Sequence, residues 1–215
     1  MLLHVAIGDK ESSACWEAFV EDMRQRGLSE PLLAVIDGNP GVRKAVGREL
    51  PNSLVQRCHV RKLRNIVNKL PHVARPAIGR LIRKAFTAAR YEEGLAQARS
   101  VIEQYREQFP AAMKCLEQDL EECLTALKFP FAHRVQIRST NLMERLFGEG
   151  KRRTKVIPRF TSETSGLSLV FAVLVDASEG WRGVRIKPYI EERLKQMVTE
   201  PESEWEDPNL KDVTA

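Results

Sequence analysis

The chain has 215 residues, a length typical of one large domain or of one domain that carries an insertion. Hydrophobic residues make up 43% of the sequence and charged residues 29%, which excludes a disordered tail and leaves enough apolar material for a sizeable core. No apolar run approaches the roughly 20 residues of a membrane-spanning helix, and residues 1–10 lack the pattern of a signal peptide. We therefore expect a cytoplasmic protein with no membrane partner.

The net charge of +5 conceals a strong division of charge along the chain. Residues 51–91 contain ten lysines and arginines and no acid, whereas residues 92–125 contain eight acids and three basic residues. Residues 134–159 are basic again, and the chain from residue 191 onward is acidic. A charged run is usually just a solvated face, but two basic stretches around an acidic one indicate a surface that binds a polyanion.

The first part of the chain alternates between strand and helix patterns. Strands are predicted at residues 2–7, 32–36 and 54–57. Helices are predicted between them, at residues 12–26 and 40–50. Gly27 is expected to end the first helix in a left-handed conformation, and Asn39-Pro40 opens the second. This alternation is typical of a sheet with crossover helices.

Residues 60–127 show a wholly helical pattern, in which Pro71, Pro76 and Pro110 mark the breaks. We interpret this segment as a helical insertion of roughly 65 to 70 residues. The chain then returns through residues 135–137 to three further elements. These are a helix from Asn141, a loop around Pro158 and a second helix at about residues 162–177.

Asp37 is the first candidate for chemistry, because it follows a strand that is predicted to be buried. In open α/β sheets, ligands bind at the carboxyl ends of the strands, and a carboxylate held there suits a metal ion. The alternative is that Asp37 only forms an Asx turn with the segment from Asn39 to Gly41. The local sequence favours neither interpretation.

The second candidate is Glu144, in the predicted helix that begins at Asn141. As a structural residue, Glu144 can reach back to the amide of Asn141 in a capping box. The apolar stripe of this helix is predicted at Leu142, Met143, Leu146 and Phe147. This stripe leaves Glu144 on the opposite face, together with Gly148 and Lys151.

Gly148 and Gly150 reduce helix propensity by about 1 kcal/mol each relative to alanine. We interpret them as positions that something approaches closely, and a nucleic-acid backbone fits. The following residues Arg152, Arg153 and Lys155 can contact its phosphates.

Three segments carry a family resemblance: VIDGNPGVRKAV at residues 35–46, VQRCHVRKLRNI at residues 55–66 and IRSTNLMERLFGEGKRRTKVIPRF at residues 137–160. They resemble the Mutator-type transposases of bacterial insertion sequences, a DDE family with an RNase H-like core. Glu144 lies 107 residues after Asp37, and a helical insertion between the two acids is also similar to that family's arrangement.

The resemblance implies an α/β fold, with an RNase H-like core and a large all-helical insertion. The first part of the core is expected at residues 1–66, the insertion at residues 67–133, the rest of the core with its glutamate-bearing helix at residues 134–190, and an acidic tail at residues 191–215. The family's first aspartate lies on a strand upstream of residues 3–11. We therefore expect an incomplete core without its first catalytic strand, in a chain truncated at the N-terminus.

By the same resemblance, Asp37 is the second acid of the catalytic triad and Glu144 the third. They would bind Mg²⁺ or Mn²⁺ for two-metal cleavage and strand transfer on DNA. The expected DNA-binding residues are Arg57, Arg61, Lys62, Arg64, Asn141, Arg145, Lys151, Arg152, Arg153 and Lys155. The expected partners are the element ends, the target DNA and further copies of the chain, with the protein on the nucleoid when it is bound to DNA.

The motif after the third strand departs from the family pattern. Where the family often has Cys-x-x-His, this chain has Cys58-His59-Val60-Arg61, which places an arginine at the histidine position. A second hypothesis, which shares the basic faces, is a non-catalytic DNA-binding remnant or regulator of the element. The missing first aspartate is what separates the two hypotheses.

Overall fold

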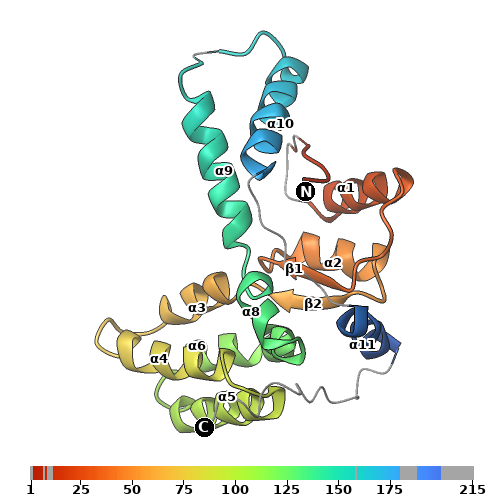
Figure 1. Cartoon of the computed structure of the whole chain (residues 1–215). Coiled ribbons are helices and arrows are strands. Elements are labelled where there is room, and N and C mark those ends of the chain that lie inside the picture. The colour runs from red at the N-terminus through yellow and green to blue at the C-terminus, as the bar shows by residue number, and fades with distance from the viewer. Residues whose placement is uncertain (1, 7, 9–11, 158, 180–187, 200–215) are drawn as a thin grey trace. The chain divides into compact units, whose positions relative to one another are not determined.

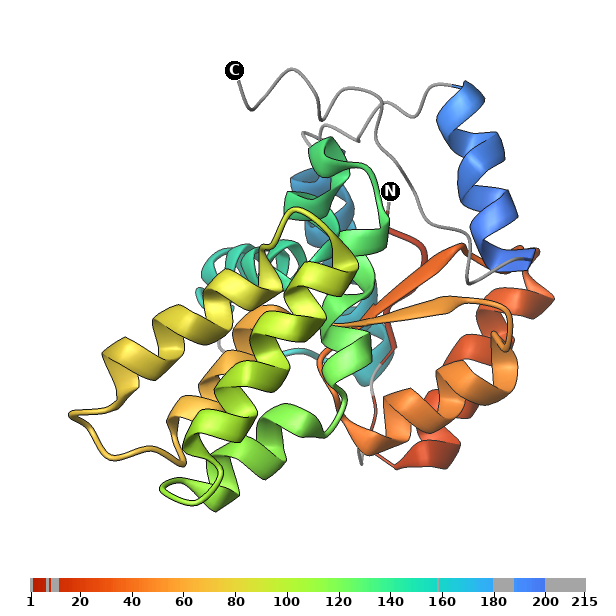
Figure 2. The ribbon, with the colours of Figure 1, turned by 90° about the horizontal axis from the view of Figure 1, so that it is seen from below.

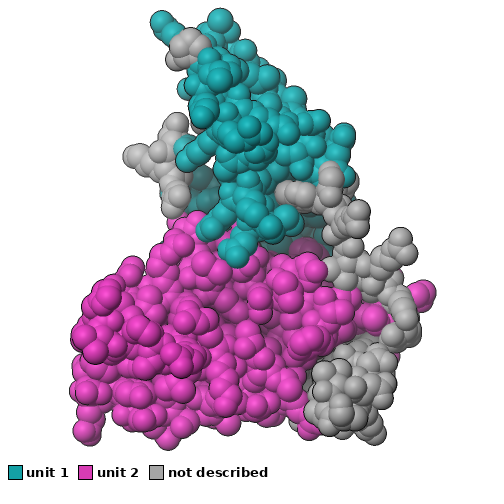
Figure 3. Space-filling view, turned by 60° about the vertical axis from the view of Figure 1, so that its left-hand side comes forward, with its two compact units in different colours: residues 1–30, 40–51, 141–185 teal, residues 31–39, 52–140, 186–215 magenta. Residues whose placement is uncertain are grey.

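The computed structural model describes residues 2–6, 8, 12–157, 159–179 and 188–199 (Figure 1). The chain divides into two compact units, which Figure 3 shows in teal and magenta. Unit 1 comprises Met1–Glu30, Pro40–Pro51 and Asn141–Arg185, and unit 2 comprises Pro31–Asn39, Asn52–Thr140 and Ile186–Ala215. Each unit therefore combines segments that are distant in the sequence.

Unit 1 is helical in its described part. Its helices are α1 (Ser13–Gln25), α2 (Pro40–Glu49), α9 (Asn141–Thr154) and α10 (Glu163–Glu179). The helix α1 packs against α2, where Glu17 and Arg48 form an ion pair at 2.8 Å, and α9 packs against α10. The side chain of Ser12 caps α1 by accepting a hydrogen bond from the N–H of Cys15. Gly27, with a φ of +95°, follows this helix as the sequence predicts.

The strand predicted at residues 2–7 is absent from the described residues 2–6. The ring of His4 instead packs on Phe19 of α1, with ring centroids 4.4 Å apart, and its Nε2 lies 3.4 Å from Asp22. A strand needs a neighbouring strand for its backbone N–H and C=O groups, and the described part of unit 1 contains none. The prediction is therefore wrong for these residues, whose side chains pack on a helix.

Unit 2 joins a small parallel sheet to a set of helices. The strand β1 (Leu33–Ile36) pairs in parallel with β2 (Leu54–Arg57), so that Ile36 lies opposite Arg57. The helices are α3 (His59–Val67), α4 (Arg75–Phe86), α5 (Tyr91–Tyr105), α6 (Pro110–Glu117), α7 (Leu120–Leu124), the 3-10 helix η1 (Thr125–Lys128), α8 (Phe131–Ile137) and α11 (Pro188–Thr199). Both strands and the helical pattern of residues 60–127 are confirmed, and residues 135–137 form the end of α8.

The helical part of unit 2 has an apolar core of its own. Its buried residues all lie between Ile66 and Leu127 in the sequence, and Ile82, Met113 and Leu116 are among the most buried. The helices α4 and α5 lie side by side in this part (Figures 1 and 2). A second cluster contains Phe129, Leu194, Leu32, Leu33, Leu54, Ile137 and Ile190. No helix in the described ranges is long and apolar enough to cross a membrane.

A buried polar cluster connects β2 and α3 to the segment at residues 118–126. Gln56 is fully buried; its Nε2 donates to the carbonyl of Cys123 at 3.1 Å, and its Oε1 accepts the N–H of Ala126 at 2.5 Å. The Nε2 of His59 donates to the same carbonyl of Cys123 at 2.5 Å, and its ring stacks on Phe86. A buried polar group left without a partner costs about 1–3 kcal/mol, so these bonds fix the helical core on the strand.

The environment of His59 keeps this side chain neutral. Burial lowers the pKa of His59 from 6.5 to about 4, while the hydrogen bond to the Cys123 carbonyl raises the pKa and the charge of Arg138 lowers it. The unfolded chain therefore takes up a proton at this histidine at a higher pH than the folded chain does. Folding stability contributed by neutral His59 is present above pH 6.5 and decreases as the pH falls toward 4.

We predict that this histidine reduces the free energy of unfolding by about 3 kcal/mol between pH 6.5 and pH 4. The variant His59→Gln, which keeps a donor near Cys123, should lose this dependence. The control His72→Gln replaces an exposed histidine and should retain it. Urea denaturation at a series of pH values measures the slopes, and a His59→Gln slope equal to that of the unsubstituted chain would contradict the prediction.

Candidate functional site

Asp37 lies directly after β1, in a turn that orients its carboxylate. Its Oδ1 accepts a hydrogen bond from the N–H of Asn39 at 3.0 Å, which is the Asx turn that the sequence allows. Its Oδ2 lies 3.9 Å from Nη1 of Arg61, and the side chain is 37% exposed. The turn thus fixes one oxygen, while the carboxylate remains accessible to solvent.

Arg57 supports this turn from inside unit 2. Its side chain is 4% exposed, and its Nε lies 3.8 Å from Oδ2 of Asp119. The guanidinium lies so close to Gly38 that a Cβ at this position would overlap with it, and Gly38 has a φ of +85°. The Nε and Nη1 atoms of Arg57 have no hydrogen-bond partner within the described residues.

Lys62 is also buried, and its Nζ donates to the carbonyl of Gln118 and lies 3.5 Å from Oδ2 of Asp119. Asp119 adopts a left-handed conformation, with a φ of +66°. The positive charges of Arg57 and Lys62 therefore both lie near the negative charge of Asp119. A phosphate in solvent does not reach such buried groups, so the structure does not support the DNA-binding role predicted for these two residues. The sequence does not reveal the pairing, because Asp119 is more than 50 residues away from both.

Arg61 and Arg64 of α3 differ in their exposure and in their contacts. Arg64 is exposed, while Arg61 is partly exposed and pairs with Asp37. Cys58, which precedes α3, is fully buried, and its sulfur accepts hydrogen bonds from the N–H and the hydroxyl of Thr140. The motif at residues 58–61 thus holds Thr140 with its cysteine and contacts Asp37 with its arginine.

The helix α9 presents Glu144 in its first turn, where this residue, Asn141 and Arg145 are exposed. The predicted apolar stripe is only partly buried: Leu146 is buried, but Leu142, Met143 and Phe147 are each more than a third exposed. The sequence predicts a buried apolar face opposite Glu144, but three of the four residues of that face are exposed.

The two glycines of α9 differ in their surroundings. A Cβ at Gly150 would lie 2.9 Å from Cδ2 of Leu174 in α10, whereas a Cβ at Gly148 would meet no described atom within 4 Å. The close approach at Gly150 is therefore made by a neighbouring helix of the same unit. The interpretation of Gly150 as a contact for nucleic acid is corrected by this packing.

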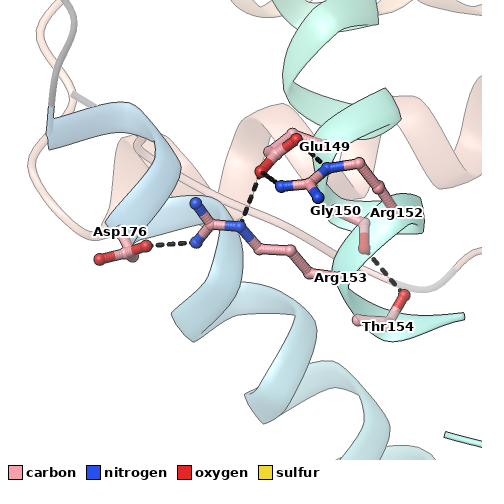
Figure 4. A network of polar contacts seen from close by, with 6 residues as sticks. All are labelled: Glu149, Gly150, Arg152, Arg153, Thr154 and Asp176. Atoms are coloured by element: carbon pink, nitrogen blue, oxygen red, sulfur yellow. Dashed lines mark hydrogen bonds and ion pairs between the residues drawn. The ribbon is translucent and has the colours of Figure 1, made fainter. Parts of the chain in front are cut away.

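The C-terminal half of α9 carries a network of ion pairs (Figure 4). The carboxylate of Glu149 accepts hydrogen bonds from Nε of Arg152 at 2.9 Å, Nη2 of Arg152 at 2.7 Å and Nε of Arg153 at 2.8 Å. Arg153 also donates through Nη1 to Asp176 of α10. Hydrogen bonds from Arg152 and Arg153 lower the pKa of Glu149 to about 2, so its carboxylate is charged at neutral pH. Lys151 and Lys155 are exposed.

Oxygen ligands for a cation are present in both units. Asp37 belongs to unit 2 and Glu144 to unit 1. Among the residues that the structure describes, no group of three or more histidine, cysteine, aspartate or glutamate side chains is placed to hold a metal ion. Asp37 and Glu144 each carry a carboxylate, the ligand chemistry that Mg²⁺ and Mn²⁺ prefer.

Comparison with known proteins places these residues in a family. The family model for the Mutator family of transposases matches residues 1–183. The chain is 29% identical over 183 residues to the transposase for insertion sequence element IS6120 of Mycolicibacterium smegmatis, which covers 85% of this chain and 57% of that protein. It is 32% identical over 197 residues to the transposase for insertion sequence element IST2 of Acidithiobacillus ferrooxidans, and the match covers 91% of this chain and 65% of that protein. It is 31% identical over 180 residues to the transposase for insertion sequence element ISRM5 of Rhizobium meliloti, and the match covers 84% of this chain and 45% of that protein.

The chain belongs to the Mutator family of transposases. The resemblance carried by the three sequence segments is thereby confirmed. The matched region spans between 45% and 65% of the length of these three relatives. The shared region contains Asp37, Arg61 and Glu144, which lie within residues 1–183.

A pair of glycines tests the support that Arg57 gives to the turn. Gly27 and Gly38 both have positive φ, but a Cβ at Gly27 would meet no described atom within 4 Å. We predict that Gly27→Ala lowers the free energy of unfolding by about 1–2 kcal/mol through backbone strain, and that Gly38→Ala costs about 1–3 kcal/mol more because Arg57 has to move. Chemical denaturation of both variants measures the difference, and equal losses would show that Arg57 does not support the turn.

Proposed function

We propose that the chain carries part of the catalytic core of an insertion-sequence transposase, which cleaves and joins DNA by metal-dependent phosphoryl transfer. The observation that carries this proposal is that a Mutator-family chain has a solvent-accessible aspartate, Asp37, at the carboxyl end of a parallel strand. The relatives' names, transposases for insertion sequence elements, support the same function.

The fold proposed for this function is a DDE-type, RNase H-like core at residues 1–66 and 134–190, with a helical insertion at residues 67–133 and a tail at residues 191–215. Two observations support it. The strands β1 and β2 are parallel, as a crossover connection requires. The helices of the proposed insertion bury an apolar core whose residues lie between Ile66 and Leu127.

Asp37 and Glu144 are the proposed ligands of Mg²⁺ or Mn²⁺. Both ions prefer oxygen ligands, and both carboxylates are accessible to solvent in their own units. When bound, a pair of such ions activates the attacking oxygen and stabilises the leaving oxygen of a phosphodiester. The chain contributes a preoriented ligand, because the Asn39 N–H fixes one oxygen of Asp37.

DNA is the proposed partner, and exposed basic side chains, together with the amide of Asn141, would bind its backbone. On α3 the contacts are Arg61 and Arg64, and at α9 the contacts are Asn141, Arg145, Lys151, Arg152, Arg153 and Lys155. These side chains reach phosphates without unfolding either unit, unlike the buried Arg57 and Lys62. Such contacts fix position on the duplex and carry no sequence information by themselves.

A second candidate function is DNA binding without catalysis. The observation that favours it is Arg61, whose guanidinium lies 3.9 Å from Asp37, at the position where the family often has a histidine. A fixed positive charge at this distance opposes the binding of a cation to the same carboxylate. The two candidates therefore differ in whether Asp37 responds to a divalent metal.

The DNA-binding proposal predicts a steep salt dependence of affinity. Each phosphate contact adds about −0.9 to the slope of log K against log salt on duplex DNA, so Arg152→Ala with Arg153→Ala should reduce the slope by up to about 2. The control double variant Arg99→Ala with Arg106→Ala removes the same charge from exposed positions in the acidic stretch and should leave the slope unchanged. Fluorescence anisotropy with labelled duplex DNA measures both. A similar slope in all three proteins would contradict the assigned contacts.

The metal proposal predicts that Mn²⁺ stabilises the chain through Asp37 and Glu144. At concentrations well above the dissociation constant, Mn²⁺ should add about 1–3 kcal/mol to the free energy of unfolding. Asp37→Asn and Glu144→Gln keep the size of each side chain and should each reduce this gain. The control Glu163→Gln, in the first turn of α10, should retain it.

Thermal melts with and without Mn²⁺ decide between the two candidate functions. Catalytic function requires a metal response that both site variants reduce. An unsubstituted chain that binds DNA but shows no Mn²⁺ response would contradict the metal proposal and favour DNA binding without catalysis.

A further inference from the structure

The basic half of α9 is engaged by acids of its own unit. Glu149 lies one turn before both arginines, and its carboxylate contacts Nε and Nη2 of Arg152 and Nε of Arg153. Asp176 on α10 accepts a hydrogen bond from Nη1 of Arg153 (Figure 4). Two guanidinium groups are thus already paired, although α9 supplies the basic residues that the sequence assigns to DNA.

The geometry of this contact is that of phosphate recognition. A guanidinium binds a carboxylate or a phosphate through the same pair of parallel hydrogen bonds. Glu149 makes this two-bond contact with Arg152, at 2.9 Å and 2.7 Å, and one of its oxygens also accepts from Arg153. Two non-bridging oxygens of one phosphodiester can occupy the same donors.

We propose that Arg152 and Arg153 form a phosphodiester-binding site that Glu149 and Asp176 occupy in the free protein, so that a DNA backbone binds by displacing the two carboxylates. The nature of the ligand rests on the proposed function. The displacement itself rests on the geometry of α9 and α10.

Protonation of Glu149 would also release the arginines, but the charge state of this carboxylate favours displacement by an anion instead. Hydrogen bonds from Arg152 and Arg153 lower the pKa of Glu149 to about 2, so its carboxylate is ionised at neutral pH. An anion must therefore compete with a charged group. The side chain of Arg152 is 66% exposed, and ion pairs at such positions are weak and screened by salt, so they can be exchanged.

A single small anion is a poor competitor, whereas a DNA backbone offers many phosphates at once. Lys151 and Lys155 are exposed beside the paired arginines and attract the same backbone. The carboxylates then set the affinity: they weaken binding to DNA in general without removing the site. Glu149 and Asp176 are affinity-determining residues by this account.

The experiment measures the dissociation constant for labelled duplex DNA at low salt. Glu149→Gln keeps the side-chain size but releases both arginines from a charged partner, and it should tighten binding by about threefold to fivefold. Asp176→Asn removes one of the two acids that contact Arg153 and should give a smaller gain. The matched control Glu163→Gln removes one negative charge from an exposed position on α10 and should change the constant by less than about twofold.

A second arm places Glu149→Gln in a chain that already carries Arg152→Ala and Arg153→Ala. The gain from Glu149→Gln should disappear there, because no guanidinium is left to release. If the unsubstituted chain binds DNA but Glu149→Gln matches Glu163→Gln, or if the gain persists without the arginines, the displacement is refuted while DNA binding stands. If neither the unsubstituted chain nor Glu149→Gln binds DNA at low salt, the proposed DNA-binding function fails, and the site with it.

Discussion

The carbonyl of Cys123 accepts hydrogen bonds from two buried side chains, Gln56 and His59, and the arrangement of unit 2 depends on this pairing. The bonds join the last strand of the sheet to the helical core, which otherwise packs through apolar contacts that have no directional preference. Because unpaired polar groups in this position would each cost about 1–3 kcal/mol, alternative placements of the helices on β2 are disfavoured. A directional constraint therefore fixes where the sheet meets the helices.

The same junction positions the candidate metal ligand. The side chain that follows Gln56 is Arg57, which lies against Gly38 and near Asp119. Gly38 belongs to the turn in which Asn39 fixes one oxygen of Asp37. The carboxylate is thus held by a turn that rests on a buried guanidinium, and the helical segment contributes the charge that balances this guanidinium. By this account, the helical part of unit 2 does more than extend the surface: it stabilises the end of the strand where the chemistry is proposed.

Local features were predictable from the sequence, and long-range pairing was not. The strands β1 and β2, the helices and the end of α1 at Gly27 follow from apolar spacing and from glycine and proline positions. The strand at residues 2–7 failed because His4 packs on a helix and no strand pairs with this segment in the described part of unit 1. The burial of Arg57 beside Asp119 depends on a contact between distant residues. The pairing of Glu149 with Arg152 and Arg153 could have been predicted, because residues three and four apart are neighbours on a helix.

The central proposal is that Asp37 and Glu144 each bind Mg²⁺ or Mn²⁺ through their carboxylates. Paramagnetic broadening of backbone amide signals by substoichiometric Mn²⁺ tests it directly, because broadening falls steeply with distance from the ion. We expect the strongest losses in two segments, the turn at residues 37–39 and the first turn of α9 at residues 141–145, with the first loss reversed by Asp37→Asn and the second by Glu144→Gln. Broadening confined to one of these segments, or spread over the acidic stretch at residues 92–125, would contradict the claim.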